Sequence, residues 1–187
     1  MKKICVCTVC MIAVTFLLGG CHGNKTKSGN PEIVSDTTTV KDSTVYGVCG
    51  DGCAMHTLQL ITDNGDTLNC MLESIDGETS TEVNGGMGVG DRIGALLEKD
   101  ADGVCHVNKA VNITSLLGKW GCLDKTFQLN PDGSVEGNVK EPRPYSRWNL
   151  VNGKLVLSTD TFEIAVLGPD SLYLDGKQGR VGYRRLK

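Results

Sequence analysis

The chain has 187 residues, of which 40% are hydrophobic, 5% aromatic and 22% charged, with 24 glycines and nine cysteines. This length predicts one or two domains, and the composition is that of a soluble globular protein rather than a disordered one. A formal net charge of −3 argues against a nucleic-acid-binding protein, which would carry a basic excess. Only three histidines are present, which leaves little material for a histidine-based metal site.

Residues 1–20 have the three-part pattern of a secretory signal peptide. Two lysines give a positive start, an apolar run occupies residues 4–18, and two glycines follow. The run is shorter than the stretch of about 20 apolar residues that a membrane-spanning helix needs. We therefore predict a signal peptide rather than a transmembrane helix.

The segment Leu-Gly-Gly-Cys at residues 18–21 resembles the lipobox of bacterial lipoproteins, whose cysteine is lipidated and becomes the new N-terminus. The resemblance implies a lipid on Cys21; the alternative is an ordinary signal peptide that happens to end in a cysteine. Three acyl chains on one residue would exceed the two signals that stable membrane anchoring requires. His22 stands where Gram-negative lipoproteins retained at the inner membrane have aspartate, so we expect an outer-membrane lipoprotein. No acidic run follows Cys21, which favours an anchor that faces the periplasm.

The rest of the chain divides into a tether and two domains. Residues 21–43 are polar, lack an apolar period and predict a flexible tether. From residue 45 onward, eight Asn-Gly or Asp-Gly dipeptides separate short segments of alternating apolar and polar residues. We predict an all-β fold of two small antiparallel barrels, with five strands over residues 44–114 and eight over residues 115–187.

In the first domain we expect five strands. They are Val45–Cys49, His56–Thr62, Thr67–Leu72, Arg92–Glu98 and Cys105–Ile113. The fourth contains residues that prefer helix, but it is short and we interpret it as a strand. This domain has three Lys or Arg against eleven Asp or Glu, a net charge of −8, whereas the second has eleven against eight, or +3. The opposite signs favour docking between the two domains.

The second domain shows clean alternation in six segments. The apolar sets expected to point inward are Phe127/Leu129, Trp148/Leu150, Leu155/Leu157, Phe162/Ile164/Val166, Leu172/Leu174 and Val181/Tyr183. Leu117-Gly118-Lys119-Trp120 resembles the Gly-x-Trp signature of lipocalins and related up-and-down barrels. In that family an arginine of the last strand covers the tryptophan, and Arg184 or Arg185 is placed to do so. Short strands favour an interior filled by side chains over one that holds a ligand.

Turn and core positions within residues 46–93 resemble OB-like five-stranded barrels. Together the two domains resemble Bacteroidetes lipoproteins of unknown function that join an OB-like barrel to a lipocalin-like one. The resemblance implies the architecture and carries no catalytic residues. Many OB barrels bind nucleic acid, but a domain with a net charge of −8 repels phosphates, so we expect no nucleic-acid partner.

One hairpin gathers Cys49, Cys53, Met55 and His56, which are soft ligands suited to Cu(I) or zinc. The two thiols could also form or exchange a disulfide. We favour a local disulfide or an unmodified pair, because the CxxxC spacing differs from the CxxC of zinc knuckles. Copper-handling envelope lipoproteins also combine lipocalin-like and OB-like domains, in the reverse order, which keeps a copper role open.

The remaining cysteines outside the first 21 residues are Cys70, Cys105 and Cys122. Each shares a face with apolar residues, and we expect them to be buried free thiols; pairing of Cys70 with Cys105 is the alternative. His106 is out of phase with the apolar face of its strand and is expected to face solvent.

Catalytic motifs are absent from the sequence. The glycine-rich run at residues 85–90 lacks the Lys-Ser/Thr of a phosphate-binding loop, and no GxSxG or HExxH occurs. We predict no enzyme and no cofactor. The expected function is a non-catalytic binding or scaffold role toward an envelope protein or glycan. The alternatives are a thiol-redox or copper-handling protein using Cys49, Cys53 and His56, and a carrier of a small apolar ligand in the second barrel.

Overall fold

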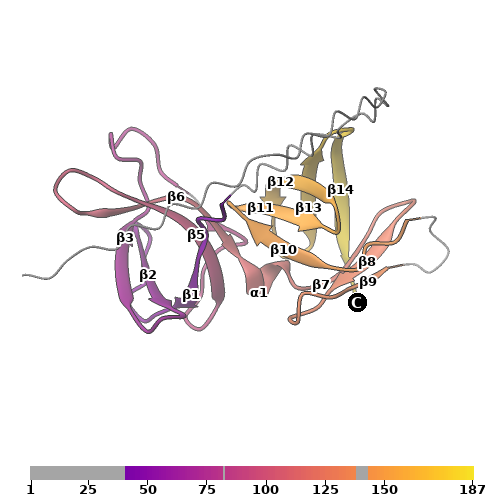
Figure 1. Ribbon diagram of the computed structural model, residues 1–187, viewed down its shortest axis with the longest axis horizontal. Coiled ribbons are helices and arrows are strands. Elements are labelled where there is room, and N and C mark those ends of the chain that lie inside the picture. The colour runs from indigo at the N-terminus through magenta and orange to yellow at the C-terminus, as the bar shows by residue number, and fades with distance from the viewer. Residues whose placement is uncertain (1–40, 82, 138–142) are drawn as a thin grey trace, which may run out of the picture. The chain divides into compact units, whose positions relative to one another are not determined.

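The computed structural model describes residues 41–81, 83–137 and 143–187. The expected signal peptide, Cys21 and nearly all of the expected tether lie outside these ranges. The structure is 57% strand and 3% helix, which confirms the all-β class. Its strands form a closed five-stranded barrel and a nearly closed eight-stranded antiparallel barrel (Figure 1). Within the described ranges, no helix has the length and apolar character needed to cross a bilayer.

The first barrel is OB-like. Its strands are β1 (Val45–Cys49), β2 (Thr57–Thr62), β3 (Thr67–Met71), β4 (Val83–Asn84), β5 (Arg92–Lys99) and β6 (Cys105–Asn112). The order is β3-β2-β1-β5-β6, and a parallel pairing of β3 with β6 closes the ring. This pair departs from the expected antiparallel pairing, because a closed ring with an odd number of strands cannot alternate direction throughout. The two-residue strand β4, which the sequence pattern did not reveal, pairs with β6 in parallel.

The second barrel is a lipocalin-like meander. Its strands are β7 (Gly118–Gly121), β8 (Thr126–Leu129), β9 (Val135–Gly137), β10 (Trp148–Val151), β11 (Lys154–Leu157), β12 (Asp160–Leu167), β13 (Ser171–Gly176) and β14 (Gly179–Leu186). The sheet runs from β10 through β14 to β7, β8 and β9. Between the end strands β9 and β10, a bridge joins Ser134 to Arg147, and the Val135 N–H donates to the Ser146 carbonyl at 2.9 Å.

Tight turns explain how such short strands pair with their neighbours. Between β10 and β11, Asn152 has a φ of 48° and Gly153 a φ of 68°. Positive φ at both central residues matches the right-handed twist of a two-residue hairpin, and asparagine and glycine tolerate this conformation best. The Asn152-Gly153 dipeptide therefore fixes where β10 ends and β11 begins.

Side chains fill the interior of the second barrel. Trp120 is fully buried, and Phe127 packs edge to face against Tyr183 with ring centroids 5.0 Å apart. The other buried apolar residues of this core are Val111, Leu116, Leu129, Val135, Leu150, Leu155, Leu157, Ile164, Leu167, Leu172 and Leu174. The expected filled interior thus has its physical basis in close-packed aromatic and leucine side chains.

Two residues expected inside this barrel are exposed instead. Val166 is 43% exposed, because the β12–β13 register shifts between Ile164 and Val166 and turns Leu167 inward. A bulge of this kind reverses the alternation for the rest of the strand. Val181 is 39% exposed, in the half of β14 that β7 does not reach.

Residues 40–187 form one compact unit. A four-residue helix, α1 (Ile113–Leu116), connects the barrels, so the expected boundary after residue 114 falls inside it. Across the junction, the Tyr46 hydroxyl donates to the Leu150 carbonyl at 2.5 Å. An ion pair at the junction joins Lys109 of the first domain to Glu163 of the second. Its charges are opposite in sign to the net charges of the two domains, which were the reason to expect docking.

Candidate functional site

Arg185 covers Trp120 at one end of the second barrel. Its guanidinium carbon lies 4.2 Å from the centroid of the indole ring, which is cation–π geometry. The same guanidinium donates to the carbonyls of Leu117 at 2.8 Å, Pro169 at 2.5 Å and Ser115. Arg185 rather than Arg184 therefore has the covering position, and it ties three chain segments together.

Gly118 leaves room for this arginine. Its φ is 119°, and a Cβ added there would lie 2.8 Å from Arg185 Nη1. The indole Nε1–H of Trp120 donates to the Leu116 carbonyl at 2.8 Å. The Gly-x-Trp segment and its arginine thus close the barrel with satisfied polar groups, and this arrangement is structural.

The soft-ligand hairpin does not assemble a metal site in this structure. Cys49 and Cys53 form a disulfide with their Cα atoms 6.5 Å apart, and Cys49 is buried. His56 is exposed, and Met55 is 83% exposed. Among the residues that the structure describes, no three His, Cys, Asp or Glu side chains lie close enough to hold a metal ion. A copper role for this hairpin requires that the disulfide first be reduced.

The other cysteines differ in state. Cys70 and Cys105 form a second disulfide, so the expectation that both are free thiols is wrong and the alternative pairing holds. The two residues face each other in the parallel pair that closes the first barrel. Cys122 is free and half-buried against the core of the second barrel.

His106 is buried, contrary to the expected exposure, and its side chain is 7% exposed. One ring nitrogen lies 3.1 Å from the Glu73 carbonyl and the other 3.2 Å from the Asp100 carboxylate. The contact with Asp100, followed by that with Glu73, raises the pKa of His106. Because both partners are acceptors, the protonated imidazole satisfies both contacts at once. Through these two contacts, His106 joins the turn between β5 and β6 to the loop after β3.

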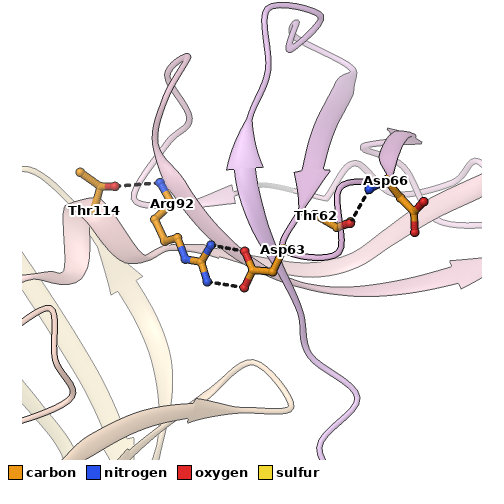
Figure 2. A network of polar contacts seen from close by, with 5 residues as sticks. All are labelled: Thr62, Asp63, Asp66, Arg92 and Thr114. Carbon is orange, nitrogen blue, oxygen red and sulfur yellow. Dashed lines mark hydrogen bonds and ion pairs between the residues drawn. The ribbon is translucent and has the colours of Figure 1, made fainter.

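A polar network lies beside the junction of the two barrels (Figure 2). Both terminal nitrogens of Arg92 donate to the Asp63 carboxylate, and the Nη2–Oδ2 distance is 2.6 Å. This hydrogen bonding lowers the pKa of Asp63. The Arg92 N–H donates to the Thr114 hydroxyl at 2.8 Å. A polar hollow of about 410 Å³ opens next to Asp63 and Tyr46. Since its arginine and aspartate already satisfy each other, we assign this network to positioning α1 against the first barrel.

A larger and more apolar groove lies on the second barrel. Its volume is about 600 Å³, and it runs between the β7–β8 turn and β14. One wall is formed by residues 121–124 and Thr126, and the other by residues 180–182, Arg184 and Leu186. Leu123 at the centre of the turn is fully exposed. Sequence reasoning did not identify this groove; a leucine between the turn residues was its one signal.

No family model, no curated protein and no solved structure matches this chain.

Proposed function

We propose that this chain is a membrane-anchored lipoprotein with a non-catalytic binding or scaffold role in the cell envelope. The lipid on Cys21 would hold it on the outer membrane, facing the periplasm. Three features support the proposal: the lipobox-like segment at residues 18–21, two disulfides of the kind that persist outside the cytoplasm, and barrels filled by their own side chains.

The groove on the second barrel is the observation that carries the binding role. Leu123, Val181 and Leu186 expose apolar surface around a hollow of about 600 Å³. Soluble proteins that gather exposed apolar side chains around a groove commonly use it for interaction. Because the barrel interior is occupied, we place recognition on this outer surface rather than in an internal ligand cavity.

The anchor is tested by labelling cells with an alkyne-tagged fatty acid. Wild-type chain and the Cys10→Ser variant, which alters another cysteine of the signal segment, should take the label and fractionate with the outer membrane. Cys21→Ser should take none. Label on Cys21→Ser, or none on the wild-type chain, would refute lipidation at Cys21.

The binding role is tested with a photo-crosslinking amino acid in living cells. Placed at Leu123, it should yield a defined adduct with an envelope component. Val89, which is 65% exposed on the first barrel, is the matched control position and should yield none. The same adducts from both positions, or none from either, would count against a binding groove.

The thiol-redox or copper-handling alternative rests on a different observation. Cys49 and Cys53 form a disulfide across only four residues, and the Cys53 end is half-exposed, where another thiol could attack it. Intact mass with and without reductant, followed by anaerobic Cu(I) titration of the reduced chain, tests this role. Copper binding that is lost in Cys49→Ser would favour it, and no copper binding would remove the copper-handling version.

A further inference from the structure

One wall of the groove is a strand with an open edge. β14 pairs with β13 along residues 179–184, but it pairs with β7 only at residues 184–186. In the described part of the chain, no strand pairs with the other side of residues 179–183. The β7–β8 turn leaves β14 at this point, and the groove occupies the space between them.

The backbone amides of this edge point into the groove. The Arg185 N–H donates to the Asp170 carbonyl at 3.0 Å, so the polar groups of Arg185 face the β13 side. Successive residues of an antiparallel ladder alternate between their two sides, and the β13–β14 register runs without a shift. The N–H and C=O groups of Arg180 and Gly182 therefore face away from β13. Such an unpaired row of backbone groups is a template for another strand.

The side chains around the edge set the chemistry of an added strand. Arg180 is held by two hydrogen bonds to Asp175, at 2.6 and 2.7 Å, which leaves its charge compensated. Arg184 has no ion pair among the described residues, and it lies at the groove where β7 ends. Asp124 is the acidic group of the opposite wall.

We propose that the open edge of β14 binds an extended segment of a partner protein as an added strand. The segment alternates acidic and apolar residues: an acidic side chain meets Arg184 on one face of the added strand, and apolar ones pack on Val181 on the other face and on Leu123. Strand addition of this kind takes affinity from backbone hydrogen bonds and specificity from alternate side chains. An acyl chain would fill the groove but has no groups to pair with the amides of Arg180 and Gly182. This inference rests on the proposed binding role and names its partner class.

The test selects ligands from a library of short random-sequence peptides displayed on phage. The target is the full chain with Cys21→Ser, kept free of detergent so that nothing else occupies the groove. We expect the enriched peptides to alternate acidic and apolar residues, and to slow amide exchange at Arg180 and Gly182. Methylating alternate backbone nitrogens of a selected peptide should abolish its binding, because those nitrogens can no longer donate.

Variants of the chain locate the binding. Arg184→Glu should weaken it about tenfold or more, since a charge-assisted contact becomes repulsive. Leu123→Asp should weaken it as well, and the full exposure of Leu123 means that the fold is kept. Arg147→Glu makes the same charge change at an exposed site outside the groove and should leave binding unchanged.

Several results would overturn the inference. The first is a selection that enriches no peptide whose binding depends on Arg184, and the second is peptide binding that persists after backbone methylation. Displacement of the peptides by laurate alone would instead indicate an acyl-chain site. Dimerisation of the chain through β14 would indicate that the edge pairs with a second copy. A chain that fails to take lipid on Cys21 but selects these peptides would contradict only the anchor. If the crosslinker at Leu123 gives an adduct in cells but no peptide binds as an added strand, the binding role stands and only the strand-addition proposal fails.

Discussion

The two disulfides of the first barrel should contribute unequally to stability, and their loop lengths give the size of the difference. Cys70 and Cys105 are 35 residues apart in sequence, whereas Cys49 and Cys53 are four apart. A crosslink stabilises the fold mainly by restricting the unfolded chain, and its contribution rises with the logarithm of loop length. This relation gives about 4 kcal/mol for the long loop and about 2 kcal/mol for the short one.

The perturbation is a pair of double variants, Cys70→Ala with Cys105→Ala, and Cys49→Ala with Cys53→Ala. Each removes two sulfur atoms, so the effect of lost side-chain volume is similar and the difference reports loop closure. With a urea dependence of about 2 kcal/mol per M, the long-loop variant should unfold about 1 M earlier than the short-loop variant. Equilibrium urea unfolding followed by tryptophan fluorescence measures both midpoints.

Two results would refute this reasoning. Equal midpoints for the two double variants would mean that loop length does not set their contributions. A peptide map of the unreduced protein without a crosslink between Cys70 and Cys105 would mean that the barrel closes without a covalent bond. Reductant should destabilise the wild-type chain at least as much as the long-loop variant, because it breaks both bridges.

Two further changes follow from the geometry of single side chains. Gly118→Ala should lower the free energy of unfolding by more than the about 1–3 kcal/mol expected for positive φ alone, since its Cβ would meet the pinned Arg185. Gly179→Ala has a φ of 109° with open space around it and is the matched control; equal urea midpoints would contradict the argument. The raised pKa of His106 contributes stability below about pH 6.5, the unfolded value, which is lost as pH rises through the folded value. His106→Gln and Asp100→Asn should both flatten this fall in urea midpoint; an unchanged slope in either would show that the pair is not its source.

The positions of the strands could be predicted because alternation and turn chemistry are local. The segment from Ile93 to Lys99 contains helix-favouring residues, yet it is a strand because its partners in β1 and β6 demand one. Tertiary pairing here overrides the weak helix propensity of a short segment. The contact of Trp120 with an arginine of the last strand is predicted instead by the resemblance to lipocalins, which leaves Arg184 and Arg185 both open.

What could not be predicted depends on where alternation breaks. A register shift in β12 turns Leu167 inward in place of Val166, and no residue type marks the bulge. His106 is buried by the loop after β3, which carries no apolar period. The disulfide between Cys70 and Cys105 could be predicted only by knowing that β3 and β6 pair to close the ring. That pairing follows from the odd number of strands and not from the cysteines themselves.

Strand pairing also explains why the groove lies where it does. In a fully paired barrel every backbone amide of β14 would meet a neighbour, but β7 is only four residues long and turns away after Gly121. The eight-residue β14 therefore extends beyond its partner and leaves an edge that neither hairpin covers. Proteins commonly blunt such edges with charge, and Arg180 and Arg184 serve that purpose against self-association. Asp175 already compensates the charge of Arg180, so it is the charge of Arg184 that would favour an acidic partner segment at this edge.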